Sequence, residues 1–391
     1  MTNRSALPFL LLLFTNTLCN SMIVPYMGFF IVEGLGKPPW IMSVYALIGI
    51  SLTIVMNRQI GKRLDAGHRV FPLVGVAAAG FALATLSLAL FPIFPVVMTL
   101  GVLGFAISSS AVSTMFTFGR AFASERGFDA TRFNSFMRAT TSTGWMIGPA
   151  VSFMVADQID ETAVFKVAFA LVVVWVGLWL RIVPRDMNAL GKDNLGEDHQ
   201  TGRNFGLWLA ICVCFSLSLA HSMTFQALPL FFVQEVGLPT YAPGTHFSIK
   251  TFVEIFAILS TPWLIQKFGM RNTLMATVAL GAITIQLLAA VTTFPQMILG
   301  AALEGLYYGL YANLSISFVQ SFAGGRVGHA TAMYWNAIMG TGILAGPLVG
   351  GIAQLHSFHL AVQVASIWAV VSLIVLLLSR GRGPSEVQST T

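Results

Sequence analysis

The amino-acid sequence predicts an all-α membrane protein with twelve transmembrane helices in two pseudo-symmetric six-helix bundles. Three observations support this fold class: the composition, the succession of long apolar runs, and a repeat that relates the two halves of the chain. Of the 391 residues, 56% are hydrophobic and 9% are charged, whereas a globular domain usually has about 25% charged residues. The mean hydropathy is +0.78. A chain this apolar cannot cover a water-facing surface, so we expect its solvent to be a lipid bilayer.

Apolar runs bounded by charged residues, glycine or proline give the helices in chain order. A membrane-spanning helix needs about 20 mostly apolar residues, and runs of that kind follow one another along the whole chain. The predicted spans are 6–32, 40–60, 70–91, 95–119, 132–156, 163–183, 205–233, 242–266, 272–293, 296–320, 327–354 and 359–380.

The most polar stretch follows the sixth span and divides the chain. We expect an N-terminal bundle over 1–183, a cytoplasmic linker over 184–204, a C-terminal bundle over 205–380 and a cytoplasmic tail over 381–391. The two bundles share three segments in register: 29–33 matches 231–235, the loop 67–69 matches 269–271, and 143–149 matches 341–347. Parallel repeats of this kind are typical of secondary transporters built from two halves.

The distribution of Lys and Arg indicates the orientation in the membrane. Twelve spans place both termini on one side. Of the 21 Lys and Arg residues, only Lys37 and Lys166 lie near the loops of the opposite side, while Arg138 and Lys250 lie inside spans. Because Lys and Arg concentrate in cytoplasmic loops, we expect both termini to be cytoplasmic. The net charge of +6 therefore reflects topology, and no nucleic-acid partner is expected.

Four ionisable residues lie inside predicted spans, where a charge is costly unless it is paired or hydrated. They are Arg138, Lys250, Glu254 and Glu304. Lys250 and Glu254 are spaced i,i+4, so they share a helix face and can pair. Glu254 is near the centre of its span, where a carboxylate can take up and release a proton. We expect Glu254, Arg138 and Lys250 to couple transport to protons; the alternative is a static salt bridge.

Polar side chains of other spans are candidates for substrate binding. Glu304 begins a face with Tyr307, Tyr308 and Tyr311 at helical spacing, which suits a sugar ring and its hydroxyls, although Tyr near a span's end also anchors helices at the interface. Amides are costly in lipid unless they face a cavity or a neighbouring helix. Hydrogen bonding between helices is the alternative role, and for His221 a satisfied histidine in the core. The substrate-binding candidates are Asn16, Asn20, Trp145, His221, Gln226, Glu304, Tyr307, Tyr308, Trp335 and Asn336.

Two further features are candidates for gating. The loop 61–69 resembles the loop signature of the major facilitator superfamily, in which acidic and basic residues pin neighbouring helix ends. Glycine and proline in spans five and eleven resemble the motif of antiporter helices, because small residues let helices approach closely and proline kinks them. For the loop, the alternative is a solvated charged turn; for the glycine and proline motif, it is tight packing without a role in gating. The gating candidates are Asp65, Arg69, Gly148, Pro149, Gly346 and Pro347.

Sequence motifs of enzymes and metal sites are absent. The chain has no HExxH pair, no Walker loop, no glycine-rich dinucleotide turn and no Cys/His metal spacing. His356 and His359 lie in a short external loop without further ligands. We therefore expect no enzyme activity, no cofactor and no metal, and transport driven by a gradient.

Nearly the whole chain resembles the sugar efflux transporters of the major facilitator superfamily. The residues that carry the resemblance are Met137-Arg138-Ala139, Trp145, Gly148-Pro149, Glu254-Ile255, Gly324-Gly325-Arg326-Val327-Gly328 and Asn336. The resemblance implies a bacterial inner-membrane exporter that exchanges protons for small sugars or glycosides by alternating access. It singles out Arg138, Glu254 and Asn336, and it implies that spans five and eight lie side by side, so that Arg138 is a second partner for Glu254.

Two other functions compete with sugar export. A multidrug/proton antiporter is favoured by the antiporter-like glycine and proline motif and by aromatic residues, since drug sites have apolar aromatic walls. A membrane sensor that binds a ligand without transporting it is the second alternative. In each case the expected partners are a small molecule and membrane lipid, with protons added for transport, and we expect a monomer.

Overall fold

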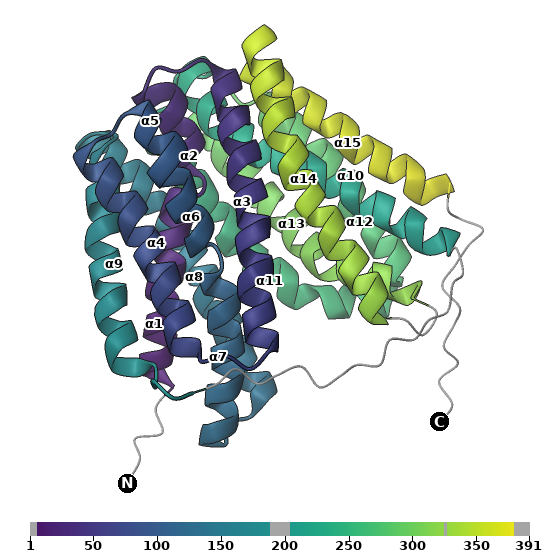
Figure 1. The fold of residues 1–391 in the computed structure, drawn as a ribbon. Helices are drawn as coiled ribbons and strands as arrows, with labels where there is room; N and C mark the ends of the chain where they lie inside the picture. The colour runs from purple at the N-terminus through teal and green to yellow at the C-terminus, as the bar shows by residue number, and fades with distance from the viewer. Residues whose placement is uncertain (1–5, 188–203, 324–326, 379–391) are drawn as a thin grey trace, which may run out of the picture. The chain divides into compact units, whose positions relative to one another are not determined.

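In a computed structural model of the protein, residues 6–187, 204–323 and 327–378 are described, and they are helical over most of their length (Figure 1). The predicted tail 381–391 and most of the predicted linker 184–204 lie outside the described residues. The helices before the linker are α1 (Leu7–Ile23), α2 (Tyr26–Phe29), α3 (Pro39–Asp65), α4 (Val70–Leu90), α5 (Phe94–Val96), α6 (Val102–Ser108), α7 (Ala111–Arg126), α8 (Ala130–Gln158) and α9 (Ala163–Ile182). Those after it are α10 (Phe205–Leu230), α11 (Ala242–Phe268), α12 (Met270–Ala289), α13 (Phe294–Ser321), α14 (Val327–Leu355) and α15 (Phe358–Leu378).

Each of the twelve predicted spans coincides with a helical stretch, and the predicted all-α membrane fold is confirmed. Within the described ranges, ten helical segments are long and apolar enough to cross a membrane. Two long helices, α8 with 29 residues and α13 with 28, are not among these ten. Their polar residues explain this, because α8 contains Arg138 and α13 contains Glu304 and three tyrosines.

The repeat predicted from the sequence has matching local structure in both halves. Residues 30–34 and 231–235 form the π-helical turns η1 (Phe30–Gly34) and η3 (Phe231–Glu235) at corresponding places. A glycine with positive φ follows each turn, Gly36 at 59° and Gly237 at 75°. The two matching loops also contain such a glycine, Gly67 at 72° and Gly269 at 79°. Because only glycine adopts positive φ without steric cost, these positions fix the same chain reversal in each half.

Residue contacts group the chain into two units. The first comprises residues 1–195 and 239–248, and the second comprises residues 196–238 and 249–391. Helix α11 therefore begins in the first unit and continues in the second. The boundaries 1–183 and 205–380 expected from the sequence stay a prediction.

Within the first unit, α8 packs against α1 through two glycines. A Cβ at Gly144 would lie 2.8 Å from Thr17 Cγ2, and a Cβ at Gly148 would lie 2.9 Å from the backbone nitrogen of Met22. The hydroxyl of Ser21 donates a hydrogen bond to the carbonyl oxygen of Gly144 at 2.8 Å. Small residues one helical turn apart thus bring the two backbones close together. Gly148 has the packing role proposed as an alternative, and its role in gating stays a prediction.

This packing predicts that Gly148→Ala destabilises the protein. The added Cβ meets the Ser21 hydroxyl and the α1 backbone, and overpacking of this kind costs about 1–3 kcal/mol. Gly177→Ala in α9 is the matched control, because nothing lies within 4 Å of a Cβ there. Thermal unfolding in detergent should show a lower Tm for Gly148→Ala than for the control. Equal Tm values would contradict the close contact.

Candidate functional site

Three helices of the second unit bring together ionisable and aromatic side chains, which we call the polar cluster. Helix α10 contributes one member, α11 two and α13 three. The members are His221, Lys250, Glu254, Glu304, Tyr307 and Tyr308. All six are among the residues predicted from the sequence as proton-coupling or substrate-binding.

Close packing of α13 against α11 positions the cluster. A Cβ at Gly309 would lie 2.6 Å from the carbonyl oxygen of Glu254 and 2.7 Å from Ala257 Cβ. A Cβ at Gly305 would meet the carbonyl oxygen of Lys250. The two glycines are one helical turn apart, so α13 lies directly on the turn of α11 that holds Lys250 and Glu254. Residues next to these glycines on α13, at 304 and 308, are thereby brought to the same place.

Lys250 interacts with two groups at once. Its Nζ lies 3.4 Å from Glu254 Oε2, so the pairing expected from the i,i+4 spacing is present. The same Nζ lies over the ring of Tyr308, 4.3 Å from its centroid, within the range of a cation–π interaction. The side chain of Lys250 is 7% exposed and that of Glu254 is 20% exposed. The pair is therefore largely shielded, and its carboxylate is the more accessible end.

His221 connects Tyr308 to the second carboxylate of the cluster. The imidazole stacks on the Tyr308 ring with centroids 3.8 Å apart and planes 21° apart. The Tyr308 ring is thus in contact with both His221 and Lys250. The Nδ1 of His221 is 3.1 Å from the Tyr307 hydroxyl and 3.4 Å from Glu304 Oε1. The six side chains form one continuous series of contacts from Glu304 to Glu254.

Burial distinguishes the two carboxylates. Glu304 and Tyr307 have no exposed surface, whereas Glu254 is partly exposed. A buried carboxylate is stable only with hydrogen-bonding or charged neighbours, and His221 is such a neighbour. Helices enclose Glu304 and Tyr307 in this structure, so their binding of a substrate stays a prediction.

Hydrogen bonds next to the cluster involve residues that the sequence did not single out. Tyr311, on the predicted face of span ten, has its hydroxyl 2.6 Å from Ser218 Oγ and donates to the carbonyl oxygen of Cys214 at 2.7 Å. Ser315 and Tyr334 form a further pair at 2.9 Å. Ser218 lies one turn before His221 on α10, and this spacing was a signal that could have identified it. These bonds tie α13 to α10 and α14.

The first unit contains a smaller polar group around α1. The amide nitrogen of Asn20 donates to Asn16 Oδ1 at 3.1 Å, and Ser108 Oγ lies 3.5 Å from Asn20 Oδ1. Nearby in sequence, Ser109 Oγ lies 3.4 Å from Asn57 Oδ1. The serines come from the run at 108–110, whose pattern did not predict a polar contact. Asn16 is fully buried, while Asn20 is partly exposed.

The remaining predicted residues are dispersed. Their roles, and the pairing of Arg138 with Glu254 in the other unit, stay predictions. The side chain of Asp65 at the end of α3 lies outside the described part, and no group of three metal-binding side chains occurs among the described residues. Exposed residues are Arg69, Arg138, Trp335 and Asn336, partly exposed ones are Trp145, Gln226 and Pro347, and buried ones are Pro149 and Gly346.

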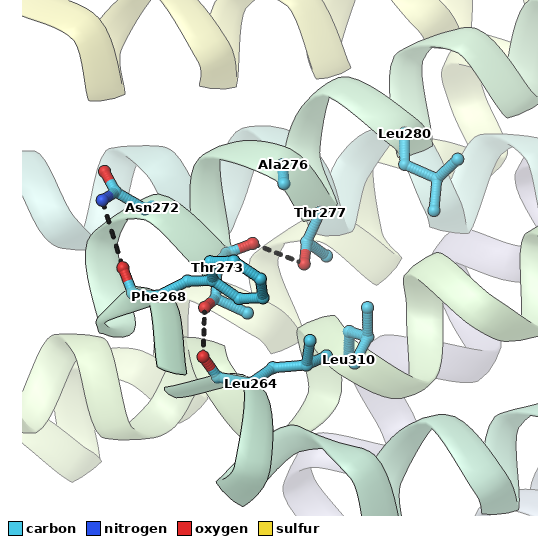
Figure 2. A pocket seen from close by; sticks show the side chains of 8 residues that line it. All are labelled: Leu264, Phe268, Asn272, Thr273, Ala276, Thr277, Leu280 and Leu310. Atoms are coloured by element: carbon cyan, nitrogen blue, oxygen red, sulfur yellow. Dashed lines mark hydrogen bonds between the residues drawn. The ribbon is translucent and has the colours of Figure 1, made fainter. Parts of the chain in front are cut away.

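A cavity of about 320 Å³ lies between the end of α11, α12 and α13, and no residue of the polar cluster lines it (Figure 2). Its lining is almost wholly apolar in character. The lining residues are Leu264, Phe268, Asn272, Thr273, Ala276, Thr277, Leu280 and Leu310.

The chain is similar over most of its length to known membrane transporters of one superfamily. The model of the Major Facilitator Superfamily matches residues 9–285. Sugar efflux transporter A of Escherichia coli (strain K12) is 25% identical over 381 residues, covering 95% of this chain and 94% of that protein. Sugar efflux transporter B of Salmonella typhimurium is 24% identical over 372 residues and covers 94% of each chain. The resemblance to sugar efflux transporters is therefore confirmed.

A solved structure shows the same fold. The crystal structure of the nucleoside transporter NupG superimposes with a TM-score of 0.79 at 16% identity, covering 98% of this chain and all of that one. At this identity the likeness concerns the fold alone. The family model, which spans more than half of the chain, establishes that this protein belongs to the Major Facilitator Superfamily and is a multi-pass membrane transporter of small molecules.

Proposed function

We propose that the protein exports small sugars or glycosides in exchange for protons, by alternating access of two six-helix bundles. The observation that carries this proposal is the polar cluster, in which a partly exposed carboxylate, Glu254, lies 3.4 Å from the ammonium of Lys250. A charged pair is costly in a membrane helix, and its presence supports a role in ion coupling. The names of the sugar efflux relatives support the substrate class.

In the proposed cycle, Glu254 takes up a proton in the outward-open state and its hold on Lys250, on Arg138 or on the sugar weakens. Release of the proton toward the cytoplasm restores the charged carboxylate and with it the high-affinity site. A separation of 3.4 Å is longer than the 2.7–2.9 Å of a strong charge-assisted hydrogen bond. The pair is thus suited to being broken and remade in each cycle.

The proposed substrate contacts come from hydrogen-bonding and aromatic side chains of both units. The amides of Asn16, Asn20, Gln226 and Asn336 can bond sugar hydroxyls, and Trp145 and Trp335 can stack on a sugar ring. Their exposed or partly exposed surfaces support this role for all except the buried Asn16. The proposed setting is a bacterial inner membrane with both termini in the cytoplasm.

Glu254→Gln should abolish proton coupling while leaving sugar exchange. In proteoliposomes, we expect proton-driven sugar efflux to fall at least tenfold, because the amide cannot exchange a proton, while counterflow without a proton gradient continues but needs a higher sugar concentration, since the neutral amide cannot form the high-affinity site. Glu125→Gln is the matched control, since Glu125 is an exposed acid in the last turn of α7. Unchanged proton-driven efflux in Glu254→Gln would remove this residue from the mechanism.

Tyr308 should act through its ring. Tyr308→Leu removes the surface over which Lys250 lies, whereas Tyr308→Phe retains it; a cation–π contact contributes about 1–2 kcal/mol when desolvated. We therefore expect proton-driven efflux about tenfold slower in the Leu variant and close to normal in the Phe variant. Equal Tm values in detergent would show that both variants fold. Equal losses in the two variants would assign the effect to the hydroxyl instead.

The alternative functions are separated by flux measurements. A panel of radiolabelled sugars, glycosides and dyes tested in the same vesicles distinguishes sugar export from multidrug antiport. A ligand that binds without any counterflow would identify a sensor.

A further inference from the structure

The apolar cavity near the α11–α12 turn lies outside the proposed transport cluster. It is bounded by the end of α11, by one face of α12 and by Leu310 of α13 (Figure 2). Its volume, about 320 Å³, falls at the small end of the range of ligand pockets. Phe268 and Ala276 on its wall are exposed, so the cavity is accessible from the surface of the second unit.

The polar side chains of the wall donate hydrogen bonds to backbone carbonyl oxygens of α12, of the turn and of the end of α11. Asn272 Nδ2 donates to the Phe268 carbonyl at 3.1 Å, Thr273 Oγ1 to the Gly269 carbonyl at 2.8 Å, and Thr277 Oγ1 to the Thr273 carbonyl at 2.8 Å. Figure 2 shows how Asn272 and Thr277 turn toward these backbone oxygens. A sugar would leave its own hydroxyls without partners in such a cavity, and water needs two to four partners. The wall therefore suits an apolar occupant.

Positive charge surrounds the same turn. Lys267 Nζ lies 5.2 Å from the ring centroid of Phe268, which lines the cavity, and 4.9 Å from that of Trp263. Arg271 precedes Asn272, another lining residue. Between Glu254 and Glu304 the sequence has no Asp or Glu. The mouth of an apolar cavity thus combines two basic residues with two exposed aromatic rings, 57% exposed for Trp263 and 50% for Phe268.

This combination is the chemistry of an anionic amphiphile. Exposed aromatic residues and Lys or Arg at a helix end are typical of the membrane interface, and basic residues there attract anionic headgroups. Arg271 donates through Nη2 to the carbonyl oxygen of Leu376, so the headgroup is assigned to Lys267 alone. We propose that one acyl chain of an anionic phospholipid occupies this cavity and that Lys267 binds its phosphate.

The proposal does not depend on the transported substrate, and it can be tested without transport. The full-length protein is mixed in detergent with equal amounts of phosphatidylglycerol and phosphatidylcholine that have the same acyl chains. Bound lipid is then counted by native mass spectrometry. We expect at least one phosphatidylglycerol to be retained at about fivefold the level of phosphatidylcholine, the preference that one basic residue gives at a membrane surface.

Two variants test the two parts of the site. Ala276→Phe fills the cavity and should abolish retention of phosphatidylglycerol, whereas Ile283→Phe, on an exposed part of α12 outside the cavity, should not. Lys267→Gln should remove the preference for phosphatidylglycerol, whereas Arg181→Gln, in the last turn of α9, should preserve it. Glycerol phosphate, which has no chain, should not displace the lipid.

Several results would overturn the proposal. Equal retention of the two lipids by the unaltered protein excludes the charge at the mouth, and full retention by Ala276→Phe excludes the cavity. Displacement by glycerol phosphate would reveal an anion site without a chain. Displacement by a transported sugar or dye would assign the cavity to the substrate pathway.

Discussion

The second unit depends on a single constraint: an ionisable side chain between membrane helices must have a partner. Glu304 is completely buried, and desolvating a carboxylate costs several kcal/mol unless neighbours compensate. The neighbours come from another helix, since His221 Nδ1 on α10 lies 3.4 Å from Glu304 Oε1. On α11, Lys250 faces the same problem and has two partners, Glu254 and the Tyr308 ring. The Tyr308 ring contacts both the imidazole of His221 and the ammonium of Lys250, and so connects these two sets of partners.

These side chains can contact one another because the backbones of neighbouring helices lie close together. Glycine, which has no side chain, allows this close approach. Gly305 and Gly309 bring α13 onto α11 beside Lys250 and Glu254, as Gly144 and Gly148 bring α8 onto α1 in the first unit. In a bilayer, helix association rests on packing and on hydrogen bonds between helices, because lipid is as apolar as the side chains. Close packing and polar contact therefore depend on each other in both units.

The sequence predicted what is local and missed what depends on the rotation of one helix against another. Long apolar runs gave every span, and the i,i+4 spacing gave the Lys250–Glu254 pair. The repeat between 29–33 and 231–235 was visible, but its π-helical geometry was not, because a π-turn depends on hydrogen-bond register. The stacking of His221 on Tyr308 joins residues 87 apart. No periodicity within one helix indicates which face of α10 meets α13, so Ser218 was also missed. Asn57 on α3 was missed for the same kind of reason, because its partner Ser109 lies outside its helix.

The Tyr308 ring matters most in the state in which Glu254 is protonated and no longer pairs with Lys250. When a carboxylate beside a buried ammonium is neutralised, the ammonium loses its counter-charge. The state with a protonated carboxylate and a buried, unpaired charge is therefore costly. In the proposed cycle the ring, which lies 4.3 Å from Lys250 Nζ, still offers about 1–2 kcal/mol of attraction in a desolvated site. This attraction does not change when Glu254 is protonated. It therefore cancels from the energy difference between the two states of Glu254 and instead holds the ammonium of Lys250 in place in both, so that Lys250 keeps one partner when the carboxylate releases it.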